Sequence, residues 1–275
     1  MPLAAVPGVP FVPGDDGLCG PAVLAMLLAH AGRIVDPAVL ADAVYLPGRG
    51  GSLQAEMLAA PRRMGRLSVE LEGGWPALAA ELSAGRPVGA LVNLSWPWWP
   101  RWHYLVVTAL AADGVRLHSG QRHDVRWSTA SFESVWARSG HWALVVLPRG
   151  ELPALADEPT VLRALLALDR SADPADAAPG WAAAARRWPD SLSAAVGAGQ
   201  AWAAAGDLAA ASAVLLSSAQ RLDRAALWNN LAALHARLGD IDAARQAARR
   251  AVERAEATEP AWLPAARRTL ADLGG

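Results

Sequence analysis

Asp15-Asp16-Gly17-Leu18-Cys19-Gly20-Pro21-Ala22 is followed at once by the apolar stretch Val23-Leu24-Ala25-Met26-Leu27-Leu28-Ala29. This pattern predicts a helix from about Gly20 to Ala31, because proline fits the first helical turn without losing a hydrogen bond. The dipole and the unpaired amides of a helix N-terminus favour a thiolate, so the pattern makes Cys19 a candidate nucleophile. The alternative interpretation is that Cys19 is a small apolar residue of the core.

Composition limits the classes of protein to consider. With 275 residues, 53% of them apolar, the chain is large enough for two globular domains. A net charge of -1 provides no general field for nucleic acid, and one cysteine excludes an intramolecular disulfide. No apolar run has the length of a membrane span and the first residues lack a signal-peptide pattern. We therefore expect a soluble chain, cytoplasmic as it stands and exported if a leader has been removed.

The sequence pattern changes near residue 150. The first part has four predicted helices, at 20–31, 36–45, 52–60 and 75–84, and the third of these should end or kink at Pro61. Five β-rich runs follow, with one helix at about 130–138 between the last two: 88–94, 103–110, 115–118, 124–127 and 142–147. Helices followed by antiparallel strands indicate an α+β domain with the cysteine helix packed against a sheet. We expect this domain at 1–150, a linker at 151–159 and an all-α domain at 160–275.

The all-α part contains an internal repeat. Gly206-Asp207-Leu208 recurs 33 residues later as Gly239-Asp240-Ile241, each time between two helical segments. This resembles tetratricopeptide repeats, which bind protein partners, although an unrelated alanine-rich bundle is the alternative.

A thiol nucleophile needs a nearby imidazole as its base. His103 is the best placed histidine, because it opens the longest predicted strand after the loop that carries Trp96, Trp98, Trp99 and Trp102. These tryptophans either cover the sheet edge or form a wall of a substrate cleft. A zinc site at Cys19, His103, His118 and His123 is disfavoured, because no pair has the close spacing of metal ligands. We predict no metal and no cofactor.

Motifs spread along the first domain resemble the papain-like bacteriocin-processing (double-glycine leader) peptidases of bacteria. The motifs are Cys19-Gly20-Pro21-Ala22, Gly51-Ser52-Leu53-Gln54, Gly85-Arg86-Pro87-Val88, Trp102-His103-Tyr104 and Trp136-Ala137-Arg138 before Trp142-Ala143-Leu144-Val145-Val146. The resemblance covers residues 6–150, with the helical part resembling a fused tetratricopeptide array. It implies a papain-like cysteine peptidase in which Cys19 attacks a peptide or isopeptide carbonyl and His103 is the base. The family's glycine-glycine leaders imply a cleavage site with small residues.

The resemblance also exposes two departures. Where relatives carry a glutamine that donates to the oxyanion, this chain has Pro13 and Gly14, so Gly14→Gln is expected to raise turnover. Where relatives carry an acidic or amide residue that orients the histidine, this chain has His118 and Ser119, and Ser119 is the candidate, with Asn93 as an alternative. Two other functions therefore stay open: a catalytically inactive peptidase fold that binds a peptide or protein, and a repeat scaffold with Cys19 in the core.

Overall fold

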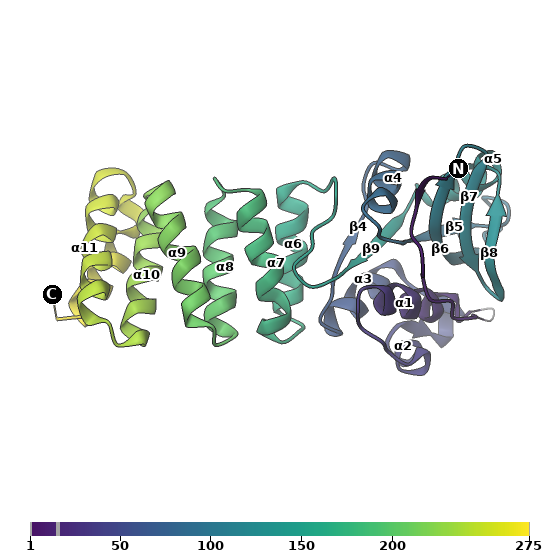
Figure 1. Cartoon of the computed structure of the whole chain (residues 1–275). Helices are drawn as coiled ribbons and strands as arrows, with labels where there is room; N and C mark the ends of the chain where they lie inside the picture. Colours follow the sequence, from purple (N-terminus) through teal and green to yellow (C-terminus); the bar gives the residue numbers. More distant parts are fainter. Residues whose placement is uncertain (1, 15–16, 275) are drawn as a thin grey trace. The chain divides into compact units, whose positions relative to one another are not determined.

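A computed structural model of the chain describes residues 2–14 and 17–274. Its contacts divide the chain into two compact units, Met1–Ala172 and Asp173–Gly275. The first unit has the predicted α+β architecture with an antiparallel sheet, and the described part of the second unit contains helices only (Figure 1). Over the described residues, no helix is both long and apolar enough to cross a lipid bilayer.

One seven-stranded antiparallel sheet forms the centre of the first unit. Its main path has the order β4-β9-β5-β6-β7-β8, and β1 pairs with the far end of β6. The strands are β1 (Pro2–Ala5), β4 (Leu67–Glu70), β5 (Val88–Asn93), β6 (Trp102–Ala111), β7 (Gly114–Ser119), β8 (Arg122–Trp127) and β9 (Ala143–Leu147). A separate ribbon of β2 (Tyr45–Leu46) and β3 (Gly51–Ser52) flanks the turn η1 (Pro47–Arg49).

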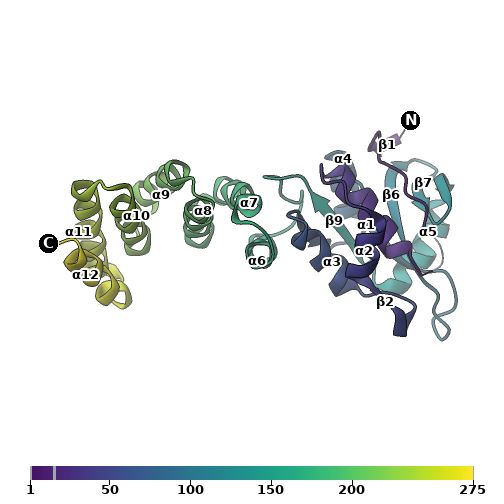
Figure 2. The ribbon, with the colours of Figure 1, turned by 90° about the horizontal axis from the view of Figure 1, so that it is seen from below.

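Helix α1 (Cys19–His30) packs against the central strands, as predicted. Every residue from Cys19 to Leu28 is buried, and a Cβ added at Gly89 of β5 would lie 3.0 Å from Leu27 and 3.3 Å from Val23. Figure 2 shows α1, α2 (Pro37–Val44) and α3 (Gln54–Arg63) gathered on one side of the sheet. Helix α1 also contacts β6, the strand that carries His103.

The remaining helices of the first unit are α4 (Trp75–Ser83), α5 (Thr129–Trp136), which continues into the turn η2 (Ala137–Ser139), and α6 (Glu158–Asp169). Several details differ from the sequence-based expectation, among them the strands β1, β2 and β3, which were not predicted. Helix α3 continues past Pro61 to Arg63, so the buried proline lies within its last turn and not at its end. Strand β4 was not predicted, since its four residues, Leu67–Glu70, become a strand only by pairing with β9.

The segment expected to be a linker is anchored to the first unit. Glu81, which is 1% exposed, accepts from Arg86 Nε at 2.6 Å and from the backbone N–H of Ala154 at 2.6 Å. Arg86 also pairs with Glu151 at 3.1 Å. Helix α6 then packs on β4 and α3, and the contacts divide the two compact units after Ala172.

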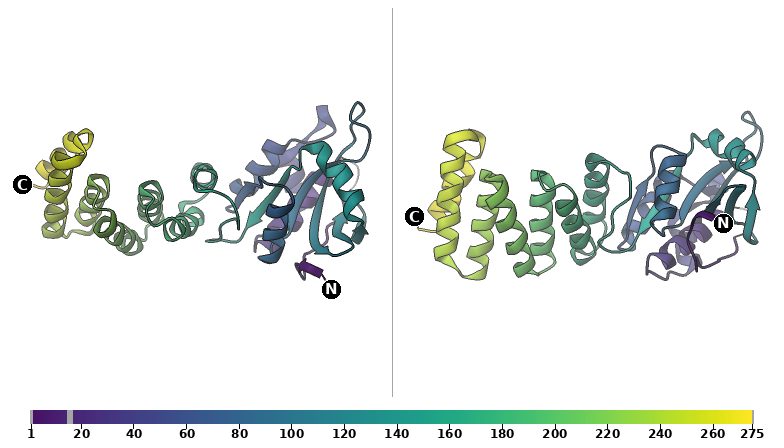
Figure 3. Two further views of the ribbon diagram at one scale, coloured as in Figure 1. Left: turned by 90° about the horizontal axis from the view of Figure 1, so that it is seen from above. Right: turned by 45° about the horizontal axis from the view of Figure 1, so that its top comes forward.

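The second unit is a succession of antiparallel helices, each packed against the next (Figure 3). They are α7 (Pro174–Arg187), α8 (Leu192–Ala204), α9 (Leu208–Leu222), α10 (Ala225–Leu238), α11 (Ile241–Thr258) and α12 (Leu263–Asp272), with the turn η3 (Pro260–Trp262) before the last. The repeated Gly-Asp pairs form matching turns between α8 and α9 and between α10 and α11. Gly206 and Gly239 have φ angles of 85° and 79°, and Asp207 and Asp240 each cap the next helix.

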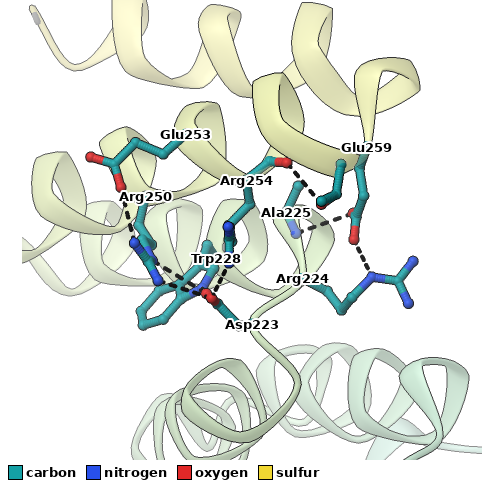
Figure 4. Close-up of polar contacts among 9 residues, drawn as sticks. Asp223, Arg224, Ala225, Trp228, Arg250, Glu253, Arg254 and Glu259 are labelled. Atoms are coloured by element: carbon teal, nitrogen blue, oxygen red, sulfur yellow. Dashed lines mark hydrogen bonds and ion pairs between the residues drawn. The ribbon is translucent and has the colours of Figure 1, made fainter.

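A polar cluster joins α9, α10 and α11 (Figure 4). Asp223, which has a left-handed backbone with φ 47°, accepts hydrogen bonds from Trp228 Nε1 at 2.9 Å, from Arg250 Nη2 at 2.9 Å and from Arg254. Glu259 pairs with Arg224 and accepts from the N–H of Ala225 at the start of α10. Hydrogen bonds of this cluster therefore connect side chains from three helices.

Candidate active site

Cys19 is the first residue of α1. Cys19 has 9% of its surface exposed to solvent, and its thiol is not in a disulfide. The N-cap residue, Leu18, provides no side-chain acceptor, and Pro21 in the same turn has no N–H. The positive end of the helix dipole therefore acts on the sulfur, which is the environment that favours a thiolate.

A pocket of about 500 Å³ brings the two main predicted residues together. Cys19 and His103 both line it, so the residue with the thiol and the residue with the imidazole share one cavity. Its other lining residues precede α1, run from η1 to the start of α3, belong to β5, or lie at and just before the start of β6: Gly17, Arg49, Gly50, Gly51, Ser52, Leu53, Gln54, Leu91, Pro100, Arg101, Trp102 and Tyr104.

His103 lies at the start of β6 and Ser119 at the end of β7. His103 Nε2 lies 2.9 Å from Ser119 Oγ, a hydrogen-bond distance. When the hydroxyl accepts from Nε2–H, the neutral ring has its lone pair on Nδ1. The contact orients the ring, and in that tautomer the free lone pair of Nδ1 can take a proton from a thiol.

Asn93, the alternative orienting residue, has a different role. It pairs with Trp102 across the strands, whereas Val92 pairs with His103. Its side-chain oxygen accepts from the N–H groups of Ser95 at 3.0 Å and Arg101 at 2.9 Å. Asn93 therefore holds the loop between β5 and β6 instead of the imidazole.

Gly14 has no room for a side chain. A Cβ at this position would lie 2.8 Å from the Cβ of Ala22 and 3.4 Å from the Cα of Cys19. The N–H of Gly14 donates to the carbonyl of Gly120 at 3.2 Å, which ties this segment to the end of β7. A glutamine at this position would have to displace its neighbours on α1, and this close packing argues against a gain in turnover from Gly14→Gln.

Tyr104 also lines the pocket, and no role was predicted for it. Burial and the negative charge of a thiolate at Cys19 raise the pKa of its hydroxyl, which therefore keeps its proton. That hydroxyl donates to the carbonyl of Ser52 at 3.2 Å and so connects β6 to the loop that forms the opposite side of the pocket. The sequence signal was its place in the Trp102-His103-Tyr104 run, directly after the candidate base.

The loop containing Ser52 packs closely on α1. A Cβ added at Gly20 would lie 2.5 Å from Ser52 Oγ, so the residue after Cys19 must be glycine for this contact to exist. Ser52 and Gln54 belong to one of the quoted family motifs, but only the structure shows that they line the same pocket as Cys19. The glycine-rich turn before them, at 48–51, was the available signal for a loop at a site.

The other histidines lie elsewhere. His118 and His123 stack on each other with ring centroids 4.5 Å apart, and Phe11 contacts both rings edge-on. His30 bonds to the carbonyl of Gly85 and His141 to Glu133. Within residues 2–14 and 17–274, no three His, Cys, Asp or Glu side chains are grouped as metal ligands.

The four loop tryptophans are largely exposed to solvent. Trp96, Trp98 and Trp99 are more than half exposed, and of the four only Trp102 lines the pocket. The expectation of a cleft wall therefore applies to Trp102 alone.

Comparison with known proteins gives a limited result. No model of a known protein family matches the chain, and no curated protein matches it. Among solved structures, a C39-like peptidase from Bacillus anthracis is 21% identical, with a TM-score of 0.46, and the match covers 53% of this chain and 98% of that one. The peptidase domain of Streptococcus ComA, a bifunctional ABC transporter involved in a quorum-sensing pathway, is 20% identical, with a TM-score of 0.43, over 51% of this chain and 99% of that one. Both likenesses are weak and cover about half of the chain, so the function is argued from the site.

Proposed function

We propose that the chain is a cysteine peptidase that cleaves a peptide or isopeptide bond. The observation that carries the proposal is the pocket shared by Cys19 and His103, with Ser119 Oγ 2.9 Å from Nε2 of the imidazole. A nucleophile at a helix N-terminus, a base and an orienting residue are the parts that acyl transfer to a thiol requires.

The reaction uses these groups in two halves. His103 Nδ1 takes the thiol proton, and the thiolate of Cys19 forms a bond to the substrate carbonyl carbon while the carbonyl electrons move to oxygen. The imidazolium then protonates the leaving nitrogen as the carbon–nitrogen bond breaks, which leaves a thioester. Water attacks the thioester and gives its proton to His103, and the carbon–sulfur bond breaks to restore the thiol.

Charge on the tetrahedral oxygen would be stabilised by backbone N–H groups in the first turn of α1. The absence of a side-chain donor at Gly14 removes an interaction that typically supplies about 10² to 10³ in turnover. This observation favours a second candidate function, in which the pocket binds a peptide or protein without turning it over.

The two candidates are separated by one set of measurements. The rate of iodoacetamide alkylation of Cys19, followed against pH, reports the thiolate in wild type and in His103→Ala. Mass spectrometry of synthetic peptides that contain Gly-Gly bonds, with Cys19→Ala as the control, reports cleavage. Fast alkylation at neutral pH that depends on His103, together with cleavage that needs Cys19, supports a peptidase. His103-dependent alkylation without cleavage supports the binding module, and equal alkylation in both proteins contradicts an activated pair.

For the second unit we propose a tetratricopeptide-type array that docks a protein partner. The support is the repeat of 33 residues and a hollow of about 630 Å³ between α9, α10 and α11. Its lining combines the apolar side chains of Leu216, Trp228 and Leu231 with polar groups that include Arg249 and Gln246. Deletion of residues 173–275 should therefore spare cleavage of a short peptide and weaken binding of the native protein substrate.

A further inference from the structure

The loop between β5 and β6 together with the first residue of β6, residues 94–102, exposes an unusual amount of aromatic surface. We call it the tryptophan loop. Trp96, Trp98, Trp99 and Trp102 are 62%, 76%, 77% and 51% exposed, and the rings of Trp96 and Trp98 are stacked with centroids 5.3 Å apart. Large apolar groups rarely gather on a protein surface unless the surface contacts another phase or molecule.

The loop is held rigidly in this exposed form. Arg138 donates to the carbonyl groups of Asn93 at 3.2 Å and Ser95 at 2.7 Å, and Asn93 accepts from the backbone at both ends of the loop. The N–H of Leu94 donates to the carbonyl of Arg101, and that of Trp99 to the carbonyl of Trp96. Exposure of the rings is therefore a property of an ordered hairpin.

This bracing also lowers the cost of taking the loop out of water. Pro97 and Pro100 have no N–H group. The backbone N–H groups of four other residues already donate to acceptors within the protein: Leu94, Ser95, Trp99 and Arg101. Backbone groups that are already paired do not have to lose hydrogen bonds to water on entering an apolar phase. Arg101 is the one charged residue of the loop, and no acidic residue occurs between Glu81 and Asp113.

We infer that the tryptophan loop contacts the surface of a lipid bilayer. Tryptophan favours the membrane–water interface, because its ring is apolar while its N–H group can remain hydrated. A peptide substrate is the less favoured occupant, since Trp96, Trp98 and Trp99 lie outside the lining of the pocket. The pocket is lined in part by Pro100, Arg101 and Trp102. Binding of the loop to a bilayer would therefore place the pocket next to the lipid surface.

The experiment is cosedimentation of the full chain with phosphatidylcholine vesicles. Wild-type protein should pellet with the vesicles, and binding should persist at high salt because ring insertion, unlike charge attraction, is not screened. The double variant Trp98→Ser/Trp99→Ser should lower the partition coefficient by about tenfold or more. Ile34→Ser removes an apolar side chain that is 90% exposed elsewhere in the same unit and should leave binding unchanged.

Folding is checked by the melting curve and by the alkylation rate of Cys19, which both variants should retain. Trp98→Asp provides a second test, since a charge on the exposed ring position opposes insertion without altering the core. The inference is overturned if wild-type protein does not pellet, or if the double variant pellets as well as wild type. It is also overturned if the tryptophan variants leave vesicle binding intact and raise only the KM for a Gly-Gly peptide, which would assign the loop to the substrate.

Discussion

Gly14 occupies a place where any side chain meets the body of α1. The nearest atom to an added Cβ is the Cβ of Ala22, a buried residue that has no other rotamer to adopt. We expect Gly14→Gln to destabilise the first unit by about 1–3 kcal/mol, the usual cost of overpacking, and not to raise turnover. Urea unfolding measures the loss, with Gly48→Ala as the matched control, because nothing lies within 4 Å of a Cβ at Gly48. A stable and more active Gly14→Gln protein would contradict the packing seen here.

In the proposed mechanism, Ser119 acts on Cys19 through the imidazole of His103. A hydrogen bond that stabilises the imidazolium also stabilises the thiolate paired with it, so Ser119→Ala should move the alkylation profile of Cys19 to higher pH. The shift should be about one to two pH units, the worth of a hydrogen bond to a charged group. The control is Ser134→Ala, which removes an exposed hydroxyl that bonds only within α5. Unchanged pH dependence in Ser119→Ala would exclude a positioning role, even if stability fell.

Cys19 and His103 could be chosen from the sequence because each is marked locally, one by a helix start and the other by a strand start. Ser119 was chosen through the family pattern, and the structure places it at hydrogen-bond distance from His103. Asn93 could not be judged in advance, since its partners depend on strand register and not on its neighbours in the chain. The role of Gly14 was equally hidden, because it depends on the distance to Ala22 across a turn.

Among the elements, long apolar strands were predicted closely and short paired ones were not. The run predicted at 88–94 is β5 at Val88–Asn93, and the run predicted at 103–110 is β6 at Trp102–Ala111. These strands are buried along most of their length, so composition alone marks them. Strand β4 depends on pairing with β9, which lies far along the sequence, and no local signal marks it.

Asp223 should make the second unit sensitive to acid. Desolvation raises the pKa of its carboxyl, but hydrogen bonds from Trp228, Arg250 and Arg254 outweigh this and hold the pKa below its usual value. This contribution to the free energy of unfolding is fully present at a pH above about 3.9, the pKa of the carboxyl in the unfolded chain. It is lost as the pH falls through the lower pKa of the carboxyl in the folded state.

Asp223→Asn tests this, because asparagine tolerates the left-handed backbone and removes only the charge. We expect it to lower the unfolding free energy by about 1–3 kcal/mol at neutral pH, with the difference disappearing in strong acid. Glu256→Gln is the control, since its ion pair with Arg267 is exposed on both sides. Equal destabilisation by the two variants would show that the Asp223 cluster adds nothing beyond a surface pair.

At the scale of the whole molecule, the first unit should depend on residues beyond the expected boundary at 150. A fragment of residues 1–150 lacks Glu151, Ala154 and α6, and it leaves the buried Glu81 and Arg86 with fewer partners. A fragment of residues 1–172 keeps them. We expect the longer fragment to melt cooperatively at a higher temperature and to retain the reactivity of Cys19, because an incompletely paired buried charge is costly. Identical melting curves for the two fragments would show that the segment 151–172 adds no stability.

The matching Gly-Asp turns of the second unit have a further consequence. Asp207 and Asp240 have ψ angles of 77° and 79° at the same φ of -86°, and each accepts from the N–H three residues on. Two turns of one geometry, 33 residues apart, make the segment between them a unit that can be copied in register. An in-frame duplication of residues 206–238 would supply one more helix pair without requiring a new kind of junction, so this half of the gene can lengthen by simple tandem copying.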